Sequence, residues 1–109
     1  MLHQELTKEK WQSLSFFEQM ANIGAEIGRA INWSKRSKKI KDAAFERGLE
    51  LLDLTIEDPK SRQHLKELCR LREVLADYFC FDNDYGSNEK EWNNYFYGFN
   101  YAASLGLRF

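Results

Sequence analysis

The segment RAINWSKRSKKIK contains a basic cluster whose residue types could bind a ligand. Cations grouped around an aromatic side chain can hold phosphate groups and stack a nucleobase. A solvated turn between two helices would have a similar composition, and Asp42 follows the run directly. The candidate nucleic-acid-binding residues are Arg29, Trp33, Lys35, Arg36, Lys38 and Lys39.

Arg72 is a second candidate, because 100° per residue places it among the leucines of a helical apolar stripe. A buried guanidinium requires a carboxylate or phosphate partner. Two interpretations are open. The stem of Arg72 packs while its head reaches a glutamate or solvent at the edge of the fold, or Arg72 marks a polar pocket or an interface between protomers.

The sequence contains no recognisable motif for metal binding or for enzymatic catalysis. The loop DNDYGSNE offers Asp82, Asp84 and Asn88 as oxygen ligands, but its glycine stands fifth instead of sixth and no glutamate stands twelfth. We therefore predict a turn instead of a calcium site. His64 precedes Glu67 by three residues, but one histidine and one carboxylate are too few ligands for a metal site. No nucleophile elbow, P-loop, Rossmann pattern or cysteine cluster occurs, so we predict no metal, no cofactor and no enzymatic activity.

Two cysteines, Cys69 and Cys80, lie in one predicted helix. Eleven residues of helix separate them by about 16 Å, which is too far for a disulfide between them. We predict two buried, reduced thiols.

The outer side of the last predicted helix has large aromatic residues among amides, where lysine and glutamate would be expected. Tyrosines with few charges around them are typical of protein interfaces. A closed two-fold dimer through this helix would be the simplest use of such a surface. The candidate interface residues are Asn93, Asn94, Tyr97, Asn100 and Tyr101.

Four amphipathic segments must position these residues, at about 15–33, 38–57, 59–81 and 88–105. Ser15 with Glu18 and Asn88 with Glu91 have the spacing of capping boxes, and Pro59 suits a first helical position. Four helices with short connections and no strand predict an all-α fold. We expect one domain over residues 1–109, folded as an antiparallel four-helix bundle.

The segment MANIGAEIGRAI places small residues where a helix would normally have larger core side chains. Gly24 and Gly28 lie beside the apolar stripe of the first predicted helix. A glycine in a helix interior costs about 1 kcal/mol relative to alanine. We therefore predict that a partner helix packs closely against both glycines, with a ligand lying on bare backbone as the alternative.

Composition and charge argue against several classes of protein, including membrane-spanning proteins and proteins with an overall positive charge. Of 109 residues, 43% are hydrophobic and 30% charged, and a single proline interrupts the chain, which is typical of an ordered helical domain. The net charge of −1 gives no global attraction to nucleic acid. No basic start precedes an apolar run, and no stretch approaches the roughly 18 apolar residues of a membrane span. We expect a cytoplasmic protein without a membrane partner.

The segments AFERGLELLDLTIEDPK and LKELCRLREVLADYF resemble those of an uncharacterised family of small bacterial all-helical proteins. The resemblance extends from about Trp11 to Ala103. In outline these proteins are similar to HEPN proteins, to the helical partners of minimal nucleotidyltransferases and to the four-helix accessory proteins of diversity-generating retroelements. The resemblance implies a helical fold and no particular activity.

Three hypotheses on function follow. The favoured one is a non-enzymatic interaction or accessory module that forms a homo-oligomer, with a larger protein as a further candidate partner. The alternative is a nucleic-acid-binding accessory protein that uses the basic cluster. The third is a HEPN-type ribonuclease, which requires an arginine followed four to six residues later by a histidine. Neither His3 nor His64 has an arginine at that distance.

Overall fold

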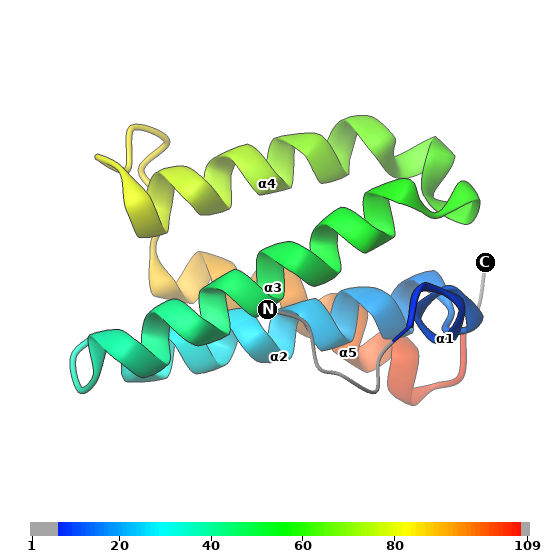
Figure 1. Ribbon diagram of the computed structural model, residues 1–109, viewed down its shortest axis with the longest axis horizontal. Coiled ribbons are helices and arrows are strands. Elements are labelled where there is room, and N and C mark those ends of the chain that lie inside the picture. The colour runs from blue at the N-terminus through cyan, green and yellow to red at the C-terminus, as the bar shows by residue number, and fades with distance from the viewer. Residues whose placement is uncertain (1–6, 108–109) are drawn as a thin grey trace.

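The computed structural model describes residues 7–107, and this part of the chain is helical without a strand (Figure 1). His3 lies outside the described residues. Five α-helices and one 3₁₀ helix follow one another: α1 (Lys8–Ser13), α2 (Phe16–Trp33), α3 (Lys38–Glu57), η1 (Pro59–His64), α4 (Leu65–Cys80) and α5 (Glu89–Ser104). The predicted all-α class is confirmed.

The element count differs from the predicted four helices in two places. A short helix, α1, precedes α2, and it buries Trp11. Six residues are too short to show a helical hydrophobic period, so the sequence pattern gave no sign of it. The segment 59–81 is divided, because Pro59 and the capping Asp58 begin a 3₁₀ turn before α4 starts at Leu65.

The capping signals determine where the longer helices begin. The Ser15 side chain accepts from the Glu18 N–H and the Glu18 side chain accepts from the Ser15 N–H, which completes the predicted capping box of α2. At the start of α5 only one half of the predicted capping box is found among the described residues, because Asn88 accepts from the Glu91 N–H without a recorded return bond. These polar groups satisfy N–H donors that have no partner inside the helix.

Helix α2 lies at the centre of the arrangement. It packs against α3 on one side and α5 on the other, while α4 packs against α3. Figure 1 shows the α2–α3 turn and the α4–α5 loop at one end of the molecule, with α1 and η1 at the other end. Because α2 has two helical neighbours, its remaining surface borders two separate seams.

The core is the apolar face of α2 with residues from every other α-helix. The apolar stripe of α2 consists of residues at helical spacing, and all of them are buried: Phe16, Met20, Ile23, Ile27 and Ile31. It meets buried residues of α3, α4 and α5, namely Leu51, Leu52, Leu68, Leu71, Leu75, Trp92 and Phe96. Burying a side chain of this size stabilises the fold by about 1.5–3 kcal/mol.

The two cysteines are exposed, so the prediction of buried thiols is wrong. At 100° per residue, Cys69 and Cys80 lie about 100° and 120° around α4 from the buried Leu68. Both therefore stand outside the apolar stripe. Leu65, which the stripe also includes, is 42% exposed.

The helical spacing of α4 places Asp77 on the side away from the apolar stripe, yet Asp77 is buried. Its helical position does face away from Leu68, but the α4–α5 loop folds back over it. The Asp77 carboxylate accepts hydrogen bonds from the N–H groups of Asp84 at 2.9 Å and Tyr85 at 3.1 Å. Asn83 adopts a φ of 56°, which the tight turn requires. The loop is the predicted turn, held by a carboxylate.

Two properties hold for the part of the chain that the structure describes. Within residues 7–107, no three histidine, cysteine, aspartate or glutamate side chains gather closely enough to hold a metal ion. None of the helices in that range is long and apolar enough to cross a membrane.

Candidate interaction surfaces on either side of α2

A shallow groove of about 210 Å³ runs between α2 and α5. Its lining comprises small residues of α2, two isoleucines at its base, and aromatic and amide residues of α5. Among the described residues, no charged side chain lines it. The lining residues are Ala21, Gly24, Ala25, Ile27, Gly28, Ile31, Trp92, Asn93, Phe96, Tyr97 and Asn100.

The two glycines of α2 differ in what surrounds them. A Cβ atom on Gly24 would lie 2.8 Å from Cβ of Phe96, so α5 approaches closely at this point as predicted. A Cβ atom on Gly28 would meet no described atom within 4 Å. The prediction of close packing at both glycines is therefore wrong for Gly28, which borders open space in the groove.

The exposed side of α5 continues the surface of the groove. Tyr97 is 66% exposed and Tyr101 56% exposed, and their rings stack with centroids 6.3 Å apart. Leu105, four residues further, is 57% exposed, so one apolar stripe extends along the helix. All five predicted interface residues are exposed, and Asn93, Tyr97 and Asn100 also line the groove.

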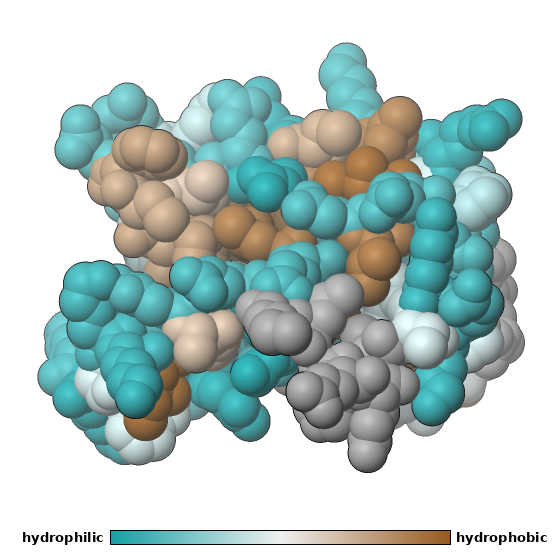
Figure 2. Space-filling view, in the orientation of Figure 1, coloured by the Kyte–Doolittle hydropathy of each residue, from teal (hydrophilic) through white to brown (hydrophobic). Residues whose placement is uncertain are grey.

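The face formed by α3 and α4 has a different character. In Figure 2, hydrophobic residues on this face form patches separated by hydrophilic side chains. Arg72 lies here and forms a two-point ion pair with Asp53 of α3, with Nε–Oδ1 at 2.7 Å and Nη2–Oδ2 at 3.3 Å. The hydrogen bond to Asp53 raises the pKa of Arg72 further above its ordinary value.

Arg72 is only partly buried, with 43% of its side chain exposed. The candidate assignment as a buried polar residue is therefore wrong. Its head lies at the edge of the fold, as in the first of the two interpretations, but its partner is Asp53 and not a glutamate.

The α2–α3 turn positions the predicted basic cluster, but it does not bring all members together. The Arg36 guanidinium lies 5.6 Å from the centroid of the Trp33 ring. Lys38 pairs with Asp42 at 2.6 Å, and this hydrogen bond raises the pKa of Lys38 and lowers that of Asp42. Lys35 is exposed at the turn itself.

Arg29 and Lys39, the other two members, line a recess between α2 and α3. The recess also includes Arg47, which was not a sequence candidate. Arg47 stands eight residues after Lys39 on α3, about two helical turns along, and that spacing was the available signal. Its Nη1 atom lies 3.2 Å from Oε2 of Glu26.

A buried polar cluster at the α1 end was also missed. Gln19 is fully buried and donates from Nε2 to the Trp11 carbonyl and to Asp58, both at 2.9 Å. The Trp11 indole N–H donates to Thr55 at 3.0 Å. Lys60 pairs with the same Asp58 carboxylate. These bonds connect α1 and η1 to α2 and α3. Breaking them would leave buried polar groups unpaired, which costs free energy of folding.

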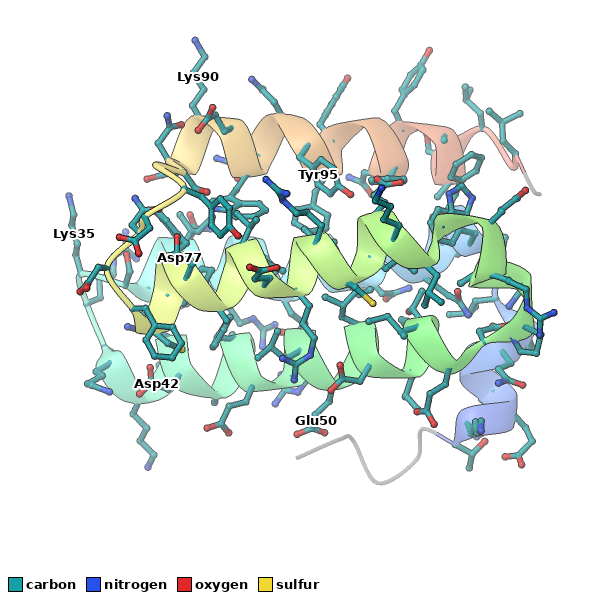
Figure 3. All side chains as sticks on the ribbon, turned by 90° about the horizontal axis from the view of Figure 1, so that it is seen from above. Lys35, Asp42, Glu50, Asp77, Lys90 and Tyr95 are labelled. Atoms are coloured by element: carbon teal, nitrogen blue, oxygen red, sulfur yellow. The ribbon has the colours of Figure 1, made fainter. Side chains whose placement is uncertain are left out.

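Tyr95 links α5 to α4. In Figure 3 its side chain extends from α5 toward α4, whereas Lys90 points away from the molecule. The Tyr95 hydroxyl donates to Glu67 at 2.8 Å. Burial, and then this hydrogen bond, raise the pKa of Tyr95 above its ordinary value. Tyr95 is therefore a contact between the two helices, whereas Tyr97 and Tyr101 are exposed.

Comparisons of this chain with models of protein families, with curated proteins and with solved structures find no match. The resemblance to HEPN-like bundles therefore stays a prediction. His64, the one histidine within residues 7–107, stacks on Phe16 with ring centroids 4.2 Å apart. Its Nδ1 atom lies 3.8 Å from Oε1 of Glu67. The features of the described residues that bear on function are the two surfaces beside α2.

Proposed function

We propose that this protein is a non-enzymatic helical interaction module that self-associates through the surface between α2 and α5. We define the α2–α5 face as the groove lining together with Tyr97 and Tyr101. The observation that supports the proposal is the absence of any charged residue from the described lining of this groove. In a chain with 30% charged residues, that composition is typical of the desolvated centre of an interface.

The α2–α5 face is suited to a second copy of the same chain. In a two-fold interface the same patch meets itself, so it must provide both protruding and receding parts. Tyr97 and Tyr101 protrude, while Ala25 and Gly28 leave a shallow hollow beside them. The tyrosines of one copy would occupy the hollow of the other, and reciprocally.

The electrostatics favour the same partner. Near a two-fold axis each residue lies close to its own copy, so a charged residue there would meet a like charge. Such juxtapositions are strongly unfavourable in a desolvated interface. The α2–α5 face avoids this repulsion, because its described polar side chains are all neutral: Trp92, Asn93, Tyr97 and Asn100 in the groove, and Tyr101 beside it.

Gly28 adds an energetic argument. A glycine within a helix costs about 1 kcal/mol relative to alanine, and tertiary contact normally compensates for that cost. At Gly24 the compensating contact is Phe96 of the same chain. At Gly28 the described residues provide none within 4 Å. Close approach of a partner side chain would provide the missing contact.

The scaffold for this face is the set of four longer helices. We infer that α2, α3, α4 and α5 serve as a four-helix bundle, with α1 and η1 closing one end. The α2–α5 seam is held at one point by the Gly24–Phe96 approach, and the rigid core below it keeps the tyrosines in register. A preformed surface loses less conformational entropy when it binds.

The test is the molar mass measured by light scattering at micromolar concentration. We expect the unmodified protein to be at least a dimer and the Tyr97→Glu/Tyr101→Glu variant to be a folded monomer. The matched control is Leu65→Glu/Phe81→Glu, which adds the same two charges at exposed apolar residues outside the α2–α5 face. The control should keep the mass of the unmodified protein, and far-ultraviolet circular dichroism should show the same helicity in all three.

Two results would contradict the proposal. A monomeric unmodified protein at these concentrations would remove self-association altogether. An oligomer that persists in the double tyrosine variant would remove the α2–α5 face as its location.

A further inference from the structure

A recess between α2 and α3 lies on the other side of α2 from the α2–α5 face. Its volume is about 470 Å³. Three basic side chains line it, Arg29 from α2 and Lys39 and Arg47 from α3. Ser37, the N-cap of α3, is also part of the lining. The recess therefore brings together cations that lie up to eighteen residues apart in the sequence.

Much of this positive charge is uncompensated. Within residues 7–107, neither Arg29 nor Lys39 has a carboxylate within 4 Å of its charged nitrogen atoms. Arg47 contacts Glu26 through Nη1 alone. The acidic residues three positions from Lys39 and from Arg29 are already paired, Asp42 with Lys38 and Lys41, and Glu26 with Arg47. An anion that entered the recess would meet two cations without competing carboxylates.

The charge continues beyond the recess. Residues 29–41 contain six lysines and arginines and no acidic residue, whereas the whole chain has a net charge of −1. Lys35 and Arg36 extend the positive surface around the α2–α3 turn. A run of cations suits a ligand with regularly repeated negative charges better than a single small anion.

An aromatic side chain adjoins the recess. Trp33 follows Arg29 by four residues on α2, so both lie on the same side of that helix. Trp33 is half-buried, and the Arg36 guanidinium lies above its ring. A flat surface of this kind can stack an unpaired nucleobase.

We propose that the α2–α3 recess binds the phosphate backbone of single-stranded nucleic acid. Arg29 and Lys39 contact phosphates within the recess, Arg47 assists through its remaining N–H groups, and the Arg36–Trp33 pair stacks a neighbouring base. This site is separate from the α2–α5 face, so one molecule can self-associate and bind a strand at the same time.

The experiment titrates a fluorescein-labelled single-stranded RNA of twelve nucleotides with the unmodified protein and follows fluorescence anisotropy. With three phosphates neutralised, affinity should fall about 20-fold between 50 and 200 mM salt, since the slope for single strands is about −0.7 per phosphate. Arg29→Ala/Lys39→Ala removes two of these contacts. We expect its affinity at 50 mM salt to fall at least about tenfold and its salt slope to decrease by about 1.4.

The matched control is Lys66→Ala/Lys90→Ala, which removes two positive charges at exposed positions outside the recess. Its affinity should change by less than about twofold, because only the recess contacts phosphates. Three results would overturn the proposal. They are no binding at 50 mM salt, equal losses in the two double variants, and equally strong competition from an unlabelled polyglutamate peptide of the same length.

Discussion

Asp58 illustrates at the level of single residues how one buried carboxylate joins three segments. It caps η1 by accepting from the Lys60 N–H at 3.0 Å, and it accepts from Gln19 Nε2 of α2. Lys60 in turn donates to the Gln12 carbonyl of α1. Burial disfavours the ionised carboxyl, but the hydrogen bonds from Lys60 and Gln19 outweigh it and lower the pKa of Asp58.

This lowered pKa predicts an acid-sensitive contribution to stability. A folded-state pKa below the unfolded value of about 3.9 stabilises the fold at higher pH, and that stabilisation is lost as pH falls through the folded pKa. Asp58→Asn should reduce the free energy of unfolding at pH 7 by about 1–3 kcal/mol. The difference from the unmodified protein should narrow between pH 5 and pH 2. Urea unfolding followed by circular dichroism across this range measures it.

Asp53→Asn provides the comparison, because Asp53 forms a half-exposed ion pair with Arg72. Pairs of this kind contribute about 0–1 kcal/mol, so Asp53→Asn should change stability less than Asp58→Asn does. A difference between Asp58→Asn and the unmodified protein that stays constant with pH would contradict the role assigned to Asp58.

Gln19 and Arg72 show what helical periodicity can predict about polar residues. Both lie within apolar stripes, yet Gln19 is fully buried and Arg72 is 43% exposed at its side chain. Periodicity gives the direction of the Cα–Cβ bond, whereas the length of the side chain decides where the polar head ends. A short glutamine stays inside and needs the Trp11 carbonyl and Asp58 as partners, which the sequence did not identify.

At the level of helices, α2 has two neighbours and its glycines have different roles. Gly24 permits the approach of Phe96, while Gly28 borders the open groove. Both have the same residue type and lie one turn apart, so sequence spacing alone could not separate them. The distinction depends on the angle at which α5 crosses α2, which only the tertiary structure provides.

Alanine substitutions at these glycines should have opposite effects. Gly24→Ala places a methyl group 2.8 Å from Phe96 and should destabilise the fold by about 1–3 kcal/mol. Gly28→Ala meets no described atom and should stabilise the folded monomer by about 0.5–1 kcal/mol through helix propensity. Gly98→Ala, also unobstructed on α5, should behave like Gly28→Ala. Denaturant midpoints of dilute protein test this, and a destabilising Gly28→Ala would contradict the open groove.

Helix boundaries were largely predictable from the sequence. Segments 15–33, 38–57 and 88–105 agree with α2, α3 and α5 to within one residue, because capping side chains and apolar periods indicate the same ends. Two features were not predictable. Helix α1 has too few residues to show a period, and the Asp58 cap and Pro59 mark where a helix begins without separating the 3₁₀ turn η1 from an α-helix.

At the level of the whole molecule, α2 separates two surfaces of different chemistry. The α5 side is without charge in its described lining, and the α3 side has three basic residues around a recess. From the sequence, the tyrosines were candidates for a protein interface, and five of the six lysines and arginines within residues 29–41 were separate candidates for nucleic-acid binding. It could not show that Ala25 and Gly28 border the same groove as Tyr97, or that Arg47 joins Arg29, since both depend on helix packing.

Sedimentation velocity of two matched variants tests self-association through the α2–α5 face most directly. Ala25 and Ala43 are both exposed within helices, but Ala25 lines the groove and Ala43 lines the recess on the other side of α2. Ala25→Leu should fill the hollow that receives a partner tyrosine and convert the protein to a monomer, whereas Ala43→Leu should sediment as the unmodified oligomer does. A monomeric unmodified protein, or two variants that sediment alike, would contradict the account.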